Sequence, residues 1–178
     1  MLQYHPWYLS ATLVERFYSY FINNLAVRKS PSPEPRLWIR SKVTTMGHLE
    51  HFWGSMQNLR IPPRNPSLSG FLSYLHRKLR HQRIGEGGWH FSWMMTPEQM
   101  IQKIENYSHT EHNRPDIKSI DAIRSALQNG TDILGKGERF RLVEVDSTFP
   151  WYLREHLDEF RAWYLDPHAQ SPKEVSDL

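Results

Sequence analysis

One histidine in residues 87–100, GGWHFSWMMTPEQM, stands among large aromatic side chains. If this stretch is a strand, His90 and Ser92 lie on one face and three aromatic side chains on the other, namely Trp89, Phe91 and Trp93. His90 then projects from a strand end, beside two glycines and just before a helix start, where ligands usually bind in open α/β sheets. We therefore take His90 as a candidate functional residue, against the alternative of a histidine hydrogen-bonded in the core.

A second group of reactive side chains lies in the polar segment SHTEHNRPD, which contains His109, Glu111 and His112. Two imidazoles and a carboxylate within four residues are able to bind a metal or transfer a proton. A His-x-x-His pair in a loop lacks the helical spacing of a metalloprotease, so no zinc signature is present. A solvated role for these residues stays open.

Two further patterns are weaker. Glu144 and Asp146 end an expected strand two residues apart, as a simple metal-binding pair would, although a solvated strand edge is the commoner explanation of such a pair. A basic group on an amphipathic helix has the charge to bind phosphate, but a charged outer face is the commoner outcome; it comprises Arg77, Lys78, Arg80 and Arg83.

Hydrophobic periodicity and capping residues predict the elements that position these side chains. Thr96 is expected to cap a helix that has Pro97 at its first position and Gln99 three residues after the cap. A Ser67 cap begins an earlier helix that carries the basic run 76–83. The remaining expected elements are strands over 15–23, 36–43, 89–93 and 139–146, and helices over 45–57, 117–129 and 150–164.

Length and composition restrict the class of protein. The 178 residues suit a single domain, which we place over 1–167, with a flexible tail over 168–178. Mean hydropathy of -0.65 and the lack of a long apolar run argue against a membrane span. The chain has no cysteine, which excludes disulfides and thiolate metal sites and fits a reducing compartment, so we expect a cytoplasmic protein.

Charge is distributed unevenly along the chain. Residues 1–83 hold 12 Lys and Arg against 3 Asp and Glu, whereas residues 84–178 hold 10 against 16. The basic N-terminal half of the sequence has the charge to bind phosphate groups in a nucleic acid, at a membrane surface or in a nucleotide.

Three segments in order resemble glycosyltransferase family 17, the family of β-1,4-mannosyl-glycoprotein 4-β-N-acetylglucosaminyltransferase. They are GGWHFSWMMTPEQMIQKIENYSHTEHNRPD, IDAIRSALQNGTDILGKG and FPWYLREHLDEFRAWYLDP. The resemblance is strongest from Gly87 to Pro167 and weaker from about Phe17 to Trp53. Its most specific part is the Gly-Trp-His-x-Ser-Trp core with the helix that follows.

The resemblance implies an α/β fold, the C-terminal portion of a GT-A-like glycosyltransferase with a mixed sheet flanked by helices. It implies transfer of N-acetylglucosamine from UDP-N-acetylglucosamine to a glycan acceptor with inversion, aided by a divalent cation, manganese or magnesium. Inverting transfer needs a base for the attacking hydroxyl and positive charge for the departing diphosphate.

The resemblance also suggests roles for individual residues. Glu111 is expected to be the catalytic base, and His90 to bind the metal or the diphosphate. Lys103 is expected to neutralise diphosphate charge. Trp93 forms a wall against which a sugar stacks, and Trp89 and His109 complete the expected substrate-binding set.

One departure from the family pattern is large. The Asp-x-Asp metal motif and the nucleotide-binding βαβ units that precede it in the family are not found here, so we expect the N-terminal nucleotide-binding half to be missing and most of the cation's ligands with it. The metal ligands therefore stay unknown. The chain would then be the C-terminal portion of a split or truncated gene, a subunit completed by a separate chain, or a degenerate relative, and is expected to be inactive alone.

Two alternatives to a transferase stay open. A nucleic-acid-binding module would use the basic half with its interleaved aromatics, although nucleic acid ranks below UDP-N-acetylglucosamine as the expected partner. A noncatalytic carbohydrate-binding remnant would use its tryptophans to stack on sugar rings without chemistry.

Overall fold

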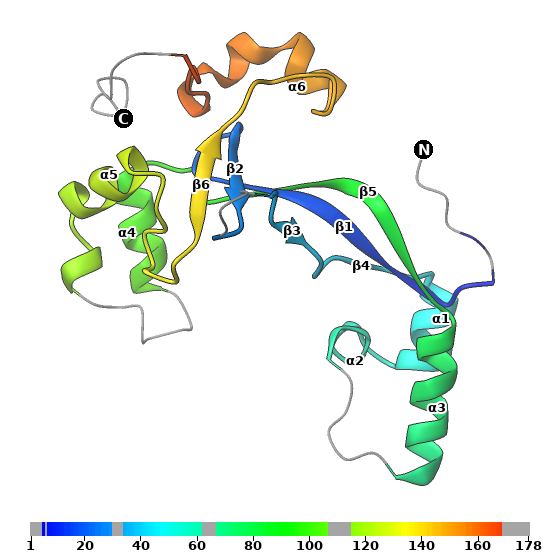
Figure 1. The fold of residues 1–178 in the computed structure, drawn as a ribbon. Helices are drawn as coiled ribbons and strands as arrows, with labels where there is room; N and C mark the ends of the chain where they lie inside the picture. The colour runs from blue at the N-terminus through cyan, green and yellow to red at the C-terminus, as the bar shows by residue number, and fades with distance from the viewer. Residues whose placement is uncertain (1–4, 6, 30–33, 62–66, 107–114, 169–178) are drawn as a thin grey trace. The chain divides into compact units, whose positions relative to one another are not determined.

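The computed structural model describes residues 5, 7–29, 34–61, 67–106 and 115–168. It is a mixed α/β structure with an open antiparallel sheet flanked by helices (Figure 1). The chain divides into two compact units, each built from separate stretches of sequence. We call Met1–Arg16 with Leu37–Trp89 the basic unit, since it holds nine Lys and Arg against three Asp and Glu. Phe17–Arg36 with His90–Leu178 is the acidic unit, which holds 13 against 16.

Strand β1 (Ser10–Ser19) pairs with four of the other five strands of the six-stranded sheet, among them β2 (Asn24–Val27), with which it is antiparallel. It pairs antiparallel with β3 (Leu37–Trp38) and β4 (Lys42–Val43), so the single strand expected over 36–43 is two short strands. It also pairs with β5 (His81–Ser92), so the glycine-containing stretch 85–88 is part of a strand. At Gly87 a Cβ would lie 2.9 Å from both the Leu13 Cβ and the Val14 amide nitrogen, so only glycine allows this approach of β5 to β1.

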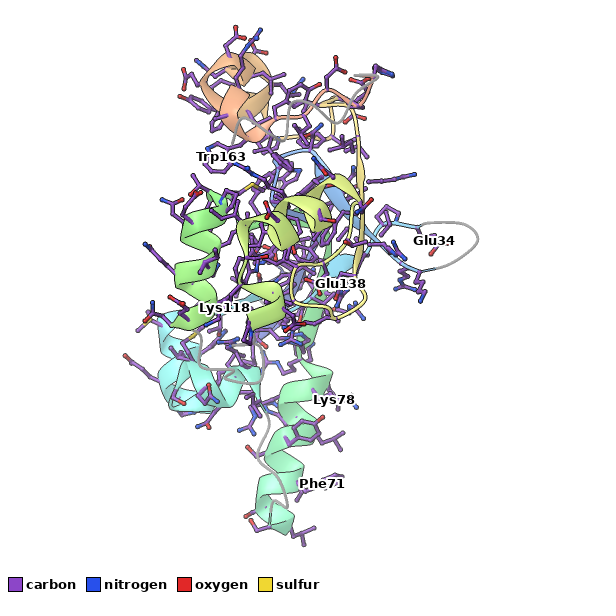
Figure 2. The ribbon with its side chains drawn as sticks, turned by 90° about the vertical axis from the view of Figure 1, so that its left-hand side faces the viewer. Glu34, Phe71, Lys78, Lys118, Glu138 and Trp163 are labelled. Carbon is purple, nitrogen blue, oxygen red and sulfur yellow. The ribbon has the colours of Figure 1, made fainter. Side chains whose placement is uncertain are left out.

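Four short or medium helices complete the basic unit: α1 (Met46–His48), the π-helix η1 (Leu49–Trp53), α2 (Met56–Arg60) and α3 (Leu68–Leu79). The Ser67 hydroxyl caps α3 by accepting a hydrogen bond from the Gly70 amide, as the sequence predicts. The large apolar side chains of α3 are solvent-exposed; they are Leu68, Phe71, Leu72, Leu75 and Leu79. Figure 2 shows the Phe71 and Lys78 side chains extending outward from this helix.

The acidic unit is built around β2 (Asn24–Val27) and β6 (Arg139–Leu142), which pair antiparallel along their whole length. Helices α4 (Pro97–Glu105) and α5 (Ile120–Gln128) bury their apolar faces against one core cluster, in which Met100, Ile104 and Ile123 are at most 1 % exposed. A second cluster contains Tyr18 and Phe149. The short 3-10 helix η3 (Pro115–Ile117) precedes α5.

Asn23 holds three parts of the acidic unit together. Its side chain is fully buried, and its amide nitrogen donates to the carbonyls of Val143, at 3.0 Å, and Leu165, at 2.7 Å. Its side-chain oxygen accepts a hydrogen bond from the Leu165 amide. A buried amide that satisfies its partners in this way fixes the register of the segments it joins.

Several expected boundaries are wrong. The strand expected over 15–23 starts at Ser10 and ends at Ser19, because Tyr20 adopts a left-handed φ of 72° and turns the chain into β2. The helix expected to carry 76–83 ends at Leu79, since His81 already pairs in β5. The strand expected over 139–146 ends at Leu142. The helix expected over 150–164 splits into α6 (Trp151–Glu155) and the 3-10 helix η4 (Leu157–Trp163).

The expected single domain over 1–167 stays a prediction. The tail expected over 168–178 lies outside the described residues, except for His168. None of the helices in the described part of the chain has both the length and the apolar character needed to cross a bilayer.

Candidate functional site

His90 lies near the end of β5 in the acidic unit, and its ring is partly buried. The imidazole contacts the Phe17 ring at a centroid distance of 5.4 Å. Phe17 packs in turn against the core cluster of α4 and α5. His90 therefore has an aromatic support that holds its ring in place.

Trp93 and Lys103 are brought together by the turn that leads from β5 into α4. The Lys103 ammonium lies 4.1 Å from the centroid of the Trp93 ring, which is a cation–π contact. Partial burial lowers the pKa of Lys103 below its usual value. A cationic side chain beside an aromatic ring is able to bind an anionic sugar derivative through its charge and through stacking. Lys103 already covers part of the Trp93 ring.

The expectation that Trp89, Phe91 and Trp93 share one face is wrong. Phe91 stacks on Tyr18 at a centroid distance of 5.4 Å and packs against the second cluster, whereas Trp93 packs against the first. The cause is the backbone of Trp93, whose φ of 58° takes it out of the strand conformation. Trp89 is 40 % exposed and belongs to the basic unit.

Helix α4 begins as the sequence predicts. The Thr96 hydroxyl accepts a hydrogen bond from the Gln99 amide, and the Gln99 side chain accepts one from the Thr96 amide, which completes a capping box. Glu98 lies in the first turn of α4, where a hydrogen bond to its own backbone amide and one to Thr96 lower the pKa of its carboxyl group. A role at the helix start accounts for the acidic side chain at this position. The strand, turn and helix expected over residues 87–100 are confirmed.

The remaining predicted residues, Glu111 and His109, lie outside the described residues, and so does His112. Of the expected site, the structure therefore brings Trp93 and Lys103 into contact and places His90 on the strand that precedes them.

The carboxylates of Glu144 and Asp146 have separate partners. Asp146 accepts hydrogen bonds from the Thr148 amide and hydroxyl in a turn, and Glu144 contacts His168. Among the described residues, no three His, Asp or Glu side chains gather closely enough to hold a metal ion.

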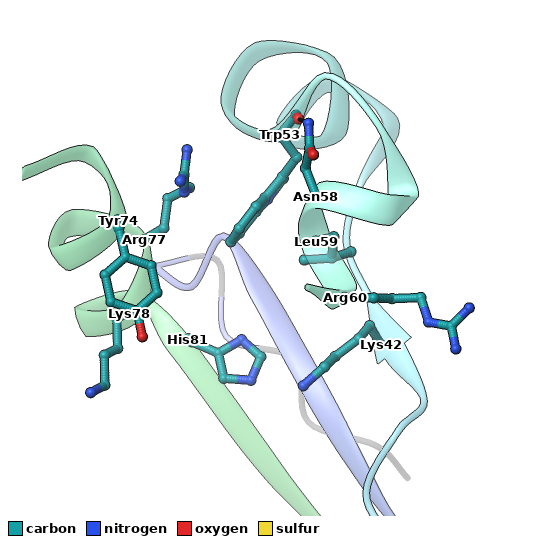
Figure 3. A pocket seen from close by; sticks show the side chains of 9 residues that line it. All are labelled: Lys42, Trp53, Asn58, Leu59, Arg60, Tyr74, Arg77, Lys78 and His81. Atoms are coloured by element: carbon teal, nitrogen blue, oxygen red, sulfur yellow. Dashed lines mark hydrogen bonds between the residues drawn. The ribbon is translucent and has the colours of Figure 1, made fainter. Parts of the chain in front are cut away.

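A pocket of about 200 Å³ lies within the basic unit. The basic side chains that line it come from β4, α2, α3 and the start of β5; they are Lys42, Arg60, Arg77, Lys78 and His81. Trp53, Tyr74, Asn58 and Leu59 complete the wall. Figure 3 shows Lys42 and His81 pointing toward each other below Trp53, while Arg60 and Lys78 reach outward.

A chain of hydrogen bonds fixes the lower part of this pocket. The Lys42 ammonium donates to the Thr12 hydroxyl, which lies 2.7 Å from the Nε2 of His81. The Nδ1 of His81 lies 2.8 Å from the Ser10 hydroxyl, so both ring nitrogens are hydrogen-bonded to hydroxyl groups of β1. Burial, followed by the charges of Lys42 and Arg83, lowers the pKa of His81 and favours the neutral ring.

The sequence pattern identified only part of this pocket. Of the basic group considered for phosphate binding, Arg77 and Lys78 line it. Arg80 instead stacks over Trp7 at 4.7 Å and donates to the Trp7 carbonyl. Lys42 and His81 gave no sequence signal, because they are 39 residues apart and meet only through the pairing of β4 and β5 with β1.

Comparisons with protein-family models, with curated proteins and with solved structures find no match to this chain.

Proposed function

We propose that the chain is part of a family-17-like glycosyltransferase that transfers N-acetylglucosamine from UDP-N-acetylglucosamine to a glycan acceptor. The observation that carries the proposal is the strand–turn–helix unit of residues 87–105, with His90 on the strand and Lys103 against Trp93. It lies in the part of the sequence where the resemblance to the family is strongest. The proposed fold is the acceptor-side portion of a GT-A-like domain.

In the proposed reaction, the Glu111 carboxylate takes the proton from the acceptor hydroxyl as its oxygen attacks the anomeric carbon. The bond from that carbon to the diphosphate breaks, and UDP leaves with the electron pair. Lys103, with His90, stabilises the negative charge that develops on the diphosphate. Trp93 positions the sugar, and His109 and Trp89 contact the substrates.

The uridine and the divalent cation are proposed to be bound by a separate polypeptide that carries a nucleotide-binding half. The exposed apolar side chains of α3 support this part of the proposal, because a row of Leu and Phe residues on one helix is a typical interaction surface. The cation would assist departure of the diphosphate, and no step assigned to this chain depends on it.

The test measures UDP release from UDP-N-acetylglucosamine with manganese and a panel of glycan acceptors, using the chain co-expressed with its upstream coding region. We expect glycan-dependent release that falls by about 10²–10⁴-fold in Glu111→Gln, the range for loss of a general base. We expect a clear loss in His90→Ala as well.

The matched control is Glu155→Gln, which neutralises an exposed carboxylate of the same unit and should leave the rate unchanged. Absence of UDP release with every acceptor would refute the transferase proposal. Glycan binding that survives both Glu111→Gln and His90→Ala, without UDP release, would instead indicate a noncatalytic carbohydrate-binding protein.

A further inference from the structure

The pocket of the basic unit carries an excess of positive charge. Four of the nine side chains that line it are Lys or Arg, a fifth is His81, and none is Asp or Glu. Burial, followed by the charge of Arg83, lowers the pKa of Lys42. A bound anion would favour the charged form of this side chain.

The lining residues also hold hydrogen-bond donors that the described residues do not use. Of the three N–H bonds of Lys42, one goes to Thr12. The Trp53 Nε1 and the Arg77 Nε are buried and have no acceptor within the described part of the chain. Unpaired buried donors are rare in folded proteins, and two in the lining of one pocket indicate an acceptor that comes from outside.

The shape of the pocket restricts the size of the ligand. Its volume of about 200 Å³ is below the roughly 300–1,000 Å³ of pockets that hold drug-sized molecules. Lys42 and His81 point toward each other in one small concavity (Figure 3), whereas nucleic-acid sites spread their charges along a groove that follows the backbone. Trp53 and Tyr74 add aromatic surface for a ring attached to the anion.

We propose that this pocket binds the phosphate group of a small phosphorylated sugar or nucleotide, with Lys42 and Arg77 as the principal contacts and His81 beside them. The Lys42 ammonium offers its remaining N–H bonds. The Arg77 guanidinium is held against Trp53 at 4.8 Å and by a 2.9 Å hydrogen bond to the Phe52 carbonyl, so it is preorganised to donate hydrogen bonds to a phosphate. Its principal contacts, Lys42 and Arg77, have no role in the transferase proposal, whose His90 and Lys103 belong to the other unit.

The experiment is calorimetric titration of the full chain at low salt with inorganic phosphate, ribose 5-phosphate and uridine monophosphate. Ribose and uridine serve as the unphosphorylated partners of the last two. We expect the phosphorylated ligands to bind and ribose and uridine not to bind. Whichever of ribose 5-phosphate and uridine monophosphate binds more tightly shows whether the natural ligand is a sugar phosphate or a nucleotide. Lys42→Gln should weaken that binding about tenfold or more, as loss of a charged hydrogen bond predicts.

Two further variants keep the test decisive. Lys78→Gln changes an exposed lining residue with little risk to folding and should weaken binding less than Lys42→Gln does. Arg40→Gln, an exposed residue of the same unit outside the pocket lining, should have no effect. The proposal is overturned by equal affinity in Lys42→Gln and wild type, by equal binding of uridine and its monophosphate, or by binding of single-stranded DNA alone.

Discussion

Gly87 is the residue whose identity the packing of β5 constrains most directly. Alanine at this position would place its Cβ 2.9 Å from the Leu13 Cβ and from the Val14 amide nitrogen, and a backbone atom cannot move aside cheaply. We expect Gly87→Ala to lower the free energy of unfolding by about 1–3 kcal/mol, the usual cost of overpacking. Chemical denaturation followed by far-UV circular dichroism measures this change.

Gly85 provides the control on the same strand. A Cβ at Gly85 meets no atom within 4 Å, and its φ is not in the left-handed region. Gly85→Ala should therefore leave the free energy of unfolding unchanged or raise it by roughly 0.4–1 kcal/mol, because alanine lowers the conformational entropy of the unfolded chain. Equal destabilisation by the two substitutions would show that β5 does not approach β1 as described.

Individual residues differ in how far their roles follow from sequence. His90 was a candidate because a histidine among aromatics beside glycines is unusual, and its place near the end of a strand is confirmed. The left-handed backbone of Trp93 has no sequence signal, since tryptophan rarely adopts it, and it separates Trp93 from Phe91. The pairing of Lys42 with His81 through Thr12 depends on tertiary structure and could not be predicted.

Helix starts are the elements that the sequence predicted best. Ser67 and Thr96 cap their helices through their hydroxyls as expected, because capping is a local interaction over three residues. Strand ends were predicted less well. The basic run 76–83 has helical composition, but pairing of β5 with β1 begins inside it and overrides that local preference.

The cap of α4 has a measurable effect on stability. Thr96→Ala removes the hydroxyl that accepts from the Gln99 amide and leaves that amide without its partner at the helix start. We expect a loss of about 1 kcal/mol in the free energy of unfolding. Thermal or chemical unfolding of the purified variant tests this expectation.

Thr96→Ser is the matched substitution, because it keeps the capping hydroxyl and should retain nearly all of the stability. If alanine and serine at this position behave alike, the capping box does not contribute to the stability of α4. Since α4 carries both Lys103 and the buried Met100 and Ile104, the same pair of variants also reports on the support of the proposed transferase site.

At the scale of the whole molecule, neither compact unit is a continuous stretch of sequence. The chain leaves the basic unit after Arg16, forms β2, returns at Leu37, and leaves again after Trp89. Strands β1 and β5 therefore contribute residues to both units. This arrangement explains why the charge difference between halves of the sequence, +9 against -6, becomes the smaller difference of +6 against -3 between the units.

The interleaved chain path predicts that residues 90–178 do not fold alone. This fragment lacks 17–36, which supply β2, the only described partner strand of β6, and the core residues Tyr20, Phe21 and Ala26. It also lacks Asn23, which joins the segments around Val143 and Leu165. A fragment of residues 17–178 keeps all of these groups, so we expect a cooperative thermal transition in that fragment and none in 90–178, measured by near-UV circular dichroism. A cooperative transition in residues 90–178 would mean that β6, α4 and α5 form a stable core without β2, and that the acidic unit does not depend on the N-terminal strands.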